Sequence, residues 1–345
     1  MRGKKVLNVL LVGAGAVGQV YGYYLAKADA DVSFLVKEKH AAECRRGFLL
    51  YYLNNRAKRR DPIRFSASGI FTKPEELTQK KWDQVYLCFS STALQSYLAG
   101  EDFKRLRAAI GNATLVLLQP GPEDREAVLK QFPADQLISG MISIVSYHAP
   151  LEGESFPETG VAYWIPPLSP SPLSGPKMRL KEVVDALNQG GLPAKAHPDV
   201  AKLSAFPAAL LMPFLVALEN AGWSFNQLKA SDALTLVSRA TSEAMAILSK
   251  RLGTHPPRLL GLFGKKIGKT AYKSILSLAP HFTPFPLETY LKAHFTKVGD
   301  QTRLIMRTYV ELGKKEDLST QALETLMTQI DANRVVAGAM PRARV

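Results

Sequence analysis

The residues best suited to chemistry lie near the start of the chain, where the spacing G-x-G-x-x-G is met by Gly13, Ala14, Gly15, Ala16, Val17 and Gly18. A compact apolar run, Val6–Val12, precedes this motif, and apolar residues at helical spacing follow it over Gly18–Ala28. Between a strand and a helix, the first glycine permits a tight turn, the second admits a pyrophosphate to the backbone, and the third lets helix and strand pack closely. The amides at the helix N-terminus then attract phosphate. The motif therefore predicts a dinucleotide-binding turn.

The end of the next predicted strand, Asp31–Val36, indicates which dinucleotide binds. NAD-binding chains usually carry an acidic residue at this position, where it accepts hydrogen bonds from the ribose hydroxyls. Here the position is taken by Lys37, which can pair with a ribose 2′-phosphate, and Lys39 and His40 add cationic character. Glu38 argues the other way, and a solvated charged turn is the alternative. The predicted cofactor is NADP(H) rather than NAD(H).

A histidine after the fifth predicted strand, Leu137–Val145, is a candidate proton donor. Ligands of a doubly wound sheet bind beyond the carboxyl ends of its strands, and imidazole titrates near neutral pH. His148 is therefore a candidate catalytic residue, with Tyr147 as a second donor candidate. The alternative is a histidine that only fills a loop.

A second set of charged residues recurs three or four positions apart, as on one helix face: His294, Lys297, Asp300, Arg303 and Arg307. If that face lines a cleft between two domains, Arg303 or Lys297 could hold a substrate carboxylate. A solvated helix face with internal ion pairs is the alternative.

The chain is strongly basic, with 44 Lys and Arg against 30 Asp and Glu and a net charge of +14. Such a charge favours a phosphate-bearing or otherwise acidic ligand. One cluster comprises Arg45, Arg46, Arg56, Lys58, Arg59 and Arg60. It either steers an anionic cofactor or is a solvated loop. A nucleic-acid surface would need exposed aromatic residues, but Tyr51 and Tyr52 read as part of a strand, so nucleic acid is not the expected partner.

The elements that must position these residues change character along the chain. Short apolar strands alternate with helices in the first half, with further strands at Trp82–Phe89 and Thr114–Gln119, and Val161–Ile165 reads as an edge strand pair or meander. After residue 195 the pattern is helical throughout. The predicted fold class is α/β: a Rossmann-type doubly wound parallel sheet in a domain of residues 1–195, then an all-helical domain of residues 196–345. The long helical segments expected there are Phe206–Trp223, Ala230–Leu252, Pro257–Leu278, Glu288–Gly313 and Thr320–Val336.

Composition excludes several classes of protein. A chain of 345 residues with 46% hydrophobic and 21% charged residues is typical of a globular protein, not a disordered one. With only Cys44 and Cys88, neither a disulfide scaffold nor a zinc–cysteine cluster is expected, no metal site is predicted, and the predicted compartment is the cytoplasm. The apolar run Ala208–Leu218 is short and contains Pro213, so it predicts a core helix rather than a membrane span.

The order of several short motifs resembles that of the ketopantoate reductase family: GAGAVG at Gly13–Gly18, FLVK at Phe34–Lys37, CFSSTALQ at Cys88–Gln95, LLQPG at Leu117–Gly121, SYHA at Ser146–Ala149, LNQGGL ending at Leu192, HPDV at His197–Val200 and VGDQT at Val298–Thr302. The resemblance implies a Rossmann domain joined to a helical domain, a reductase that uses NADPH, and by analogy a homodimer formed through the helical domain. It also implies that Ser90 and Gln119 contact the cofactor.

The catalytic residues of that family are not matched. Counting from His197–Val200, the family's general-acid lysine falls on Pro207 and its two asparagines on Leu211 and Leu215. The family's acidic residue that holds the polar end of the substrate corresponds to Asp300. General-acid assistance is worth about 10²–10⁴-fold in rate, so ketopantoate is not the expected substrate.

Three functions therefore remain open. The first hypothesis is an NADP(H)-dependent oxidoreductase that acts on another small carbonyl, hydroxy or imine substrate. The second is a catalytically inactive NADP(H)-binding sensor or regulatory protein. The third is a basic nucleic-acid-binding surface on a relic fold.

Overall fold

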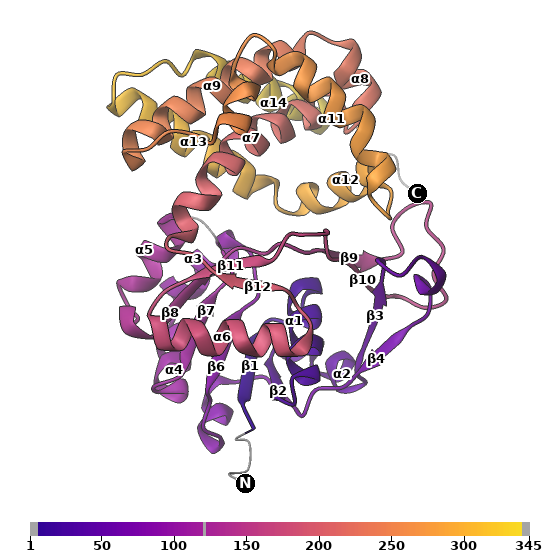
Figure 1. Ribbon diagram of the computed structural model, residues 1–345, viewed down its shortest axis with the longest axis vertical. Coiled ribbons are helices and arrows are strands. Elements are labelled where there is room, and N and C mark those ends of the chain that lie inside the picture. The colour runs from indigo at the N-terminus through magenta and orange to yellow at the C-terminus, as the bar shows by residue number, and fades with distance from the viewer. Residues whose placement is uncertain (1–5, 120–121, 340–345) are drawn as a thin grey trace. The chain divides into compact units, whose positions relative to one another are not determined.

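The computed structural model describes residues 6–119 and 122–339 (Figure 1). Contacts divide the chain into two compact units, Met1–Ala201 and Lys202–Val345. Their boundary lies six residues beyond the one predicted after residue 195.

The first unit is built on an eight-stranded sheet with the order β12-β11-β8-β7-β6-β1-β2-β5. Every neighbouring pair is parallel except β11 and β8. The predicted parallel sheet is thereby confirmed. Its strands are β1 Asn8–Val12, β2 Asp31–Leu35, β5 Gly69–Phe71, β6 Gln84–Leu87, β7 Thr114–Leu117, β8 Leu137–Gly140, β11 Ser171–Ser174 and β12 Ala194–Ala196.

Both faces of this sheet are buried, as continuous apolar strands require. Alternate residues of β1 belong to different hydrophobic cores. Val9 and Leu11 pack with helices α1 (Ala16–Lys27) and α6 (Lys177–Gly190). Leu10 and Val12 belong to the core on the opposite face. That face is covered by α3 Ser91–Ala99 and α4 Glu101–Ile110, while α2 Glu38–Arg45 and α5 Pro122–Leu129 complete the helices of the unit.

A second sheet of the first unit has four strands, in the order β4-β3-β10-β9. Its strands are β3 Phe48–Tyr52, β4 Ile63–Phe65, β9 Val145–Ala149 and β10 Gly160–Trp164. The prediction of one strand over Leu137–Val145 is wrong, because the chain leaves the large sheet after β8 and enters the small one at β9. Of the two alternatives for Val161–Ile165, the edge position is wrong, since β10 lies between β3 and β9. The antiparallel pairing of β10 with the preceding strand β9 agrees with the meander.

The regular elements described in the second unit are helices, as predicted. They are α7 Val200–Asn220 (which begins just before the unit boundary), α8 Phe225–Ala230, α9 Ala233–Leu252, α10 Arg258–Gly261, the short 3₁₀ turn η4 Leu262–Gly264, α11 Gly268–Phe282, α12 Leu287–Lys297, α13 Gly299–Lys315 and α14 Gln321–Ala339. Two predicted long helices are each divided: Pro257–Leu278 by η4, and Glu288–Gly313 at Val298. Apolar residues of α7, α9, α11, α13 and α14 form one core.

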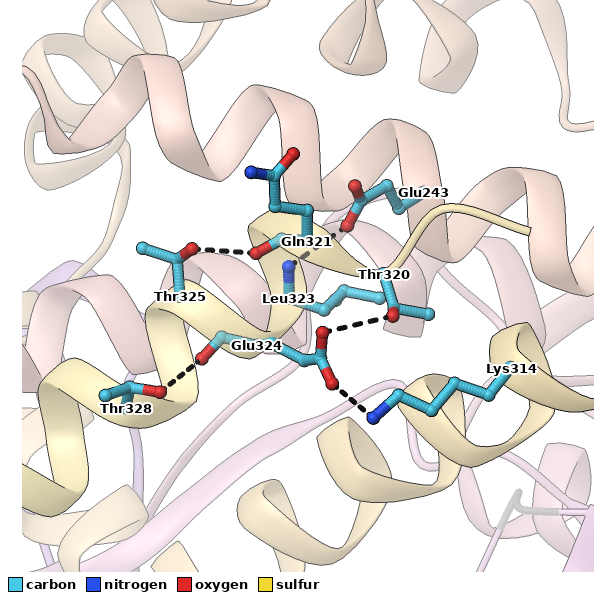
Figure 2. Close-up of polar contacts among 8 residues, drawn as sticks. All are labelled: Glu243, Lys314, Thr320, Gln321, Leu323, Glu324, Thr325 and Thr328. Atoms are coloured by element: carbon cyan, nitrogen blue, oxygen red, sulfur yellow. Dashed lines mark hydrogen bonds and ion pairs between the residues drawn. The ribbon is translucent and has the colours of Figure 1, made fainter. Parts of the chain in front are cut away.

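The start of α14 is held by a carboxylate from another helix. The Glu243 side chain on α9 accepts hydrogen bonds from the backbone amides of Ala322 and Leu323, each at 3.0 Å, as Figure 2 shows for Leu323. Those amides belong to the first turn, which has no acceptor within the helix. An ion pair between Lys314 and Glu324 ties α13 to the same turn (Figure 2). Polar contacts thus fix α14 against α9 in addition to apolar packing.

Helix α7 is long and apolar enough, by length and composition alone, to cross a membrane. The core helix of a folded unit passes the same test, and 56% of the apolar stretch is buried inside the structure. Leu215, Val216, Ala217 and Leu218 are all almost fully buried in the second unit. Helix α7 is therefore a core helix here, as the run Ala208–Leu218 predicted.

Candidate functional site

The glycine turn between β1 and α1 has the geometry that its sequence predicts. Gly13 has a φ of +102°, a conformation that side chains rarely adopt, and a Cβ there would lie 3.1 Å from the carbonyl oxygen of Cys88. Its amide donates a hydrogen bond to the Leu35 carbonyl at 2.9 Å. This bond holds the turn against the end of β2.

The other two glycines of the turn meet opposite surroundings. A Cβ on Gly18 would lie 2.3 Å from the Gly13 carbonyl oxygen and 3.2 Å from the Cβ of Cys88. A Cβ on Gly15 would meet no atom within 4 Å. Gly18 is thus needed for packing inside the protein, whereas Gly15 faces open space that an external group could fill.

The N-terminus of α1 is well prepared for an anion. Gly15 is its N-cap, no side chain caps it, and its first turn holds no acidic residue. The first hydrogen bond of the helix runs from the Gln19 amide to the Gly15 carbonyl at 3.0 Å. The amides of residues 16–18 therefore have no acceptor within the helix. The Gln19 side chain instead donates to the Ala14 carbonyl at 2.9 Å. Free first-turn amides and the helix dipole together favour a phosphate group.

Lys37 lies at the same edge of the sheet as this turn. Strands β1 and β2 are parallel, with Val12 beside Leu35, and Lys37 follows two residues later as the N-cap of α2. Its side chain is exposed, as are Lys39 and His40. The structure therefore places a cation one strand away from the glycine turn, beyond the carboxyl end of β2.

Ser90 and Gln119 follow the ends of β6 and β7, on the other side of β1 in the sheet order. The Ser90 hydroxyl caps α3 by accepting a hydrogen bond from the Ala93 amide at 3.3 Å. The buried Gln119 amide nitrogen donates to the Phe89 carbonyl. Its side-chain oxygen, Oε1, is buried and has no hydrogen-bond partner among the described residues. The last two residues of the LLQPG motif, Pro120 and Gly121, lie outside the described residues.

One buried carboxylate near this edge was not predicted. Asp124, in the first turn of α5, accepts hydrogen bonds from the Ser91 hydroxyl at 2.5 Å and the Gln95 side-chain amide at 3.1 Å. Burial raises its pKa, while these two hydrogen bonds lower it in part. Asp124 thereby joins α5 to the start of α3, next to Ser90. In sequence it is only an acidic residue at a helix start, which carries no sign of burial.

The location predicted for His148 is wrong. It lies within β9 of the small sheet, opposite Val161 of β10, rather than after a strand of the parallel sheet. Its side chain is exposed. Tyr147 is buried, and its hydroxyl donates to Glu154 at 2.7 Å. The structure therefore does not bring His148 to the carboxyl ends of the parallel strands.

The predicted continuous face from His294 to Arg307 is also wrong, because the chain changes helix at Val298. His294 and Lys297 end α12, whereas Asp300, Arg303 and Arg307 lie on α13.

Two of these α13 residues form an ion-pair cluster with α7. The Arg303 side chain is only 5% exposed and donates to Glu219 on α7, with its Nη1 at 3.1 Å from Oε2. Asp300, 87% exposed, lies 3.5 Å from the other end of that guanidinium. Arg303 is thus paired inside its own unit, and Asp300 is the open member of the cluster.

Helix α7 carries the positions that the resemblance assigns to the family's general-acid lysine and its two asparagines. Leu215 is buried, Leu211 is half-buried and Pro207 is exposed within the helix. None of these three side chains can donate a proton.

The basic cluster lies around the small sheet. Tyr51 and Tyr52 are in β3, as predicted. The Arg59 side chain donates to the Leu53 carbonyl at 2.7 Å, and Arg60 lies 5.5 Å from the ring centre of Phe156. These two arginines therefore make contacts within the fold. Among the described residues no group of three or more His, Cys, Asp or Glu could hold a metal ion.

Comparison with solved structures finds the same fold over nearly the whole chain. 2-Dehydropantoate 2-reductase from Methylococcus capsulatus matches with a TM-score of 0.66 at 17% identity, covering 98% of this chain and 100% of the other. The enzyme from Geobacter metallireducens GS-15 matches at 0.66 and 19% identity, with 95% and 100% covered. A ternary complex of D-mandelate dehydrogenase with NADH and anilino(oxo)acetate matches at 0.69 and 13% identity, with 97% and 100% covered.

Sequence comparison finds a family match for part of the first unit. No curated protein matches the chain in sequence. The family model of ketopantoate reductase PanE/ApbA, a family of NAD(P)H-dependent oxidoreductases, matches residues 9–159, which include the glycine turn and the ends of β2, β6 and β7. By this match residues 9–159, somewhat less than half of the chain, are similar in sequence to the ketopantoate reductase PanE/ApbA family.

Proposed function

We propose that the protein is an NADP(H)-dependent oxidoreductase acting on a small carbonyl, hydroxy or imine substrate other than ketopantoate. The observation that carries the proposal is the contrast within the glycine turn. Gly18 is closed off by the Gly13 carbonyl, whereas Gly15 faces open space in front of the α1 amides. A turn that keeps its backbone accessible at Gly15 fits a pyrophosphate.

The residues at this edge suit the parts of a dinucleotide. The amides of Ala16, Val17 and Gly18 would hold the pyrophosphate, and Lys37 would hold a ribose 2′-phosphate. The buried Gln119 oxygen, Oε1, which has no hydrogen-bond partner in the described part of the chain, would accept a hydrogen bond from the nicotinamide half. D-mandelate dehydrogenase, one of the similar structures, contains NADH, so the preference for NADP(H) depends on Lys37.

A bound nicotinamide supplies or accepts a hydride at the substrate carbon. The chain must then hold the substrate and manage one proton. The three α7 positions aligned with the family's acid and amides carry Pro207, Leu211 and Leu215, which cannot manage that proton. Of the predicted catalytic residues, Asp300 remains a candidate to hold the polar end of a substrate, because its carboxylate is open while Arg303 fixes its position. The apolar α7 positions favour a substrate less polar than ketopantoate.

The second candidate function is an NADP(H)-binding sensor without turnover. The same apolar α7 positions favour it, since a cofactor site can remain after a proton donor is lost. Both candidates require the glycine turn and Lys37, and they differ only in chemistry.

Fluorescence titration with NADPH and NADH, followed by NADPH oxidation against a panel of 2-keto acids, tests the proposal. We expect tighter binding of NADPH than of NADH and turnover on a keto acid other than ketopantoate. Binding without turnover on any substrate would favour the sensor. Absence of binding to either dinucleotide would overturn both candidates.

A further inference from the structure

A buried carboxylate of the first unit lies beside a more accessible hydroxyl. Asp124 on α5 is only 6% exposed, and one of its carboxylate oxygens accepts a hydrogen bond from the Ser91 hydroxyl at 2.5 Å. Its other oxygen accepts from the side-chain amide of Gln95, on α3, at 3.1 Å. Ser91 itself is half-buried. A buried acid that is hydrogen-bonded to a more accessible hydroxyl can pass a proton through that hydroxyl to a bound molecule.

This pair lies where the nicotinamide half of a dinucleotide would bind. From β1 the chain passes to β2 and β5, then crosses to β6 on the other side of β1, and ligands bind beyond the carboxyl ends of the strands at such a switch point. With Lys37 after β2 at the adenosine end, the nicotinamide end extends over β6 and β7. Ser91 begins α3 directly after β6 (Figure 1). A Cβ on Gly13 would lie 3.7 Å from the Phe89 ring, so the glycine turn is close to this segment.

A second buried group at the same place has an open position for a hydrogen bond. Gln119, which follows β7, is also 6% exposed, and its side-chain amide donates to the carbonyl of Phe89, two residues before Ser91. Its Oε1 has no hydrogen-bond partner in the part of the chain that the structure describes. Buried polar atoms are normally paired, so this oxygen indicates a place where a ligand can bond.

The surroundings of Asp124 favour its protonated form. Burial raises its pKa and the charge of Glu123 raises it further, whereas the hydrogen bonds from Ser91 and Gln95 lower it. Helix α3 contains no charged residue. The other titratable or charged residues of α3 and α5 are Tyr97, Arg125 and Glu126. Within the described ranges no ion pair joins Asp124 to a cation, so its proton is not displaced by a neighbouring positive charge.

We propose that Ser91 gives the substrate its proton during reduction and that Asp124 supplies that proton to Ser91. The inference rests on the proposed function, in which NADPH is the reductant. When the carbonyl carbon of the substrate accepts a hydride, the electron pair of the C=O π bond moves to the oxygen. That oxygen takes the proton of the Ser91 hydroxyl, and the Ser91 oxygen takes the proton of the Asp124 carboxyl.

The products balance these transfers. The nicotinamide is oxidised, the carbonyl is reduced to an alcohol, and the Asp124 carboxylate regains a proton from water. Ser91 contacts the substrate and is therefore a catalytic residue, whereas Asp124 acts through Ser91 and is a positioning residue. This pair would take the place of the proton donor that Pro207 cannot supply.

Steady-state kinetics over a series of pH values test the pair, with the 2-keto acid that gives the highest turnover in the panel. Ser91→Ala should lower kcat about 100-fold, and Ser91→Thr, which keeps a hydroxyl, should retain most of the activity. In the wild type kcat should fall as the pH rises through the pKa of Asp124, because reduction needs the protonated carboxyl. Asp124→Asn should lower kcat and remove this fall.

Matched controls come from neighbouring helices. Ser96→Ala on α3 and Asp102→Asn on α4 alter exposed residues of the same types and should leave kcat and its pH profile unchanged. The NADPH dissociation constant should change by less than about twofold in every variant, since the pair acts on the proton and not on cofactor binding. Circular dichroism checks that the variants are folded.

Infrared spectroscopy of the cofactor-free protein follows the proton itself. The carbonyl stretch of a protonated carboxyl should disappear as the pH rises through the pKa of Asp124, and this band should be missing in Asp124→Asn. Ser91→Ala should move its disappearance to higher pH, because the hydrogen bond from Ser91 lowers that pKa.

The outcomes separate this inference from the function on which it rests. A wild type that binds NADPH but turns over no keto acid would overturn the proposed function and the inference with it. Wild-type turnover that survives Ser91→Ala, or an Asp124→Asn variant with the wild-type pH profile, would overturn the inference alone. An infrared band that persists in Asp124→Asn would also overturn it.

Discussion

Two alanine substitutions in one turn should have opposite effects. Gly18→Ala would place a methyl group 2.3 Å from the Gly13 carbonyl oxygen, and Gly15→Ala would place one where no atom lies within 4 Å. We expect the first to reduce stability and the second to reduce dinucleotide binding while leaving the fold intact.

The size of the first effect follows from the distance. Carbon and oxygen atoms pack without strain at about 3.4 Å or more, so the Gly18 methyl group and the carbonyl must separate by about 1 Å. The carbonyl belongs to a turn that the Gly13–Leu35 hydrogen bond holds in place, and it cannot rotate aside as a side chain would. Overpacking of this kind costs about 3 kcal/mol of the free energy of unfolding. The ratio of folded to unfolded protein should fall about 100-fold.

The Gly15 substitution should change the free energy of unfolding by less than about 0.5 kcal/mol, because its φ of −70° and ψ of −179° are open to alanine. The methyl group would occupy the space through which a pyrophosphate reaches the α1 amides. We expect NADPH affinity to fall at least about tenfold, or about 1.4 kcal/mol.

Urea unfolding of the free protein and NADPH fluorescence titration measure the two effects separately. Gly100→Ala is a control for both measurements. Gly100 lies between α3 and α4, and a Cβ there would meet its nearest atom at 3.6 Å. If Gly15→Ala bound NADPH as tightly as the wild type, the glycine turn would not be the pyrophosphate site. If Gly18→Ala were as stable as the wild type, the close packing of α1 on the turn would be refuted.

Four further substitutions test the roles of Lys37, Asp124 and the Arg303 cluster. Lys37→Ala should weaken NADPH binding about tenfold and leave NADH binding unchanged in parallel titrations, because only NADPH has the 2′-phosphate; equal loss for both would exclude this role. Burial raises the pKa of Asp124 above its unfolded value of 3.8, so the folded protein binds the proton more tightly than the unfolded chain does. The free energy of unfolding should therefore fall as the pH rises from about 4 through that raised pKa. Asp124→Asn should abolish this fall in urea unfolding at a series of pH values, and an unchanged slope would contradict it. Arg303→Met should lower the free energy of unfolding by about 3 kcal/mol, because it leaves Glu219 without its partner. Asp300→Asn, at an exposed position, should change the free energy of unfolding by less than about 0.5 kcal/mol in the same assay. Similar effects of both substitutions would show that burial does not decide the strength of this cluster.

The glycine turn and the parallel sheet could be predicted because both depend on neighbours in sequence. Gly13 needs a positive φ whatever surrounds it, and the strand and helix that flank it are set by the local apolar pattern. The position of Lys37 at the strand end follows from the same local count.

Predictions failed where an element's partner lies far away in the chain. The apolar run over Leu137–Val145 gave no sign that β8 pairs with β7 while β9 pairs with β10 in another sheet. His148 was therefore placed at the wrong edge. Helical spacing from His294 to Arg307 likewise concealed the change of helix at Val298.

Sequence alone thus determined the class of fold, the glycine turn and its basic neighbour, since these depend on backbone geometry and on the order of residues. Only the tertiary structure decided that Asp124 is buried between α3 and α5 and that Arg303 is paired with Glu219. The Arg303–Glu219 pair joins residues 84 positions apart, and local periodicity holds no information about which residues will meet over such distances.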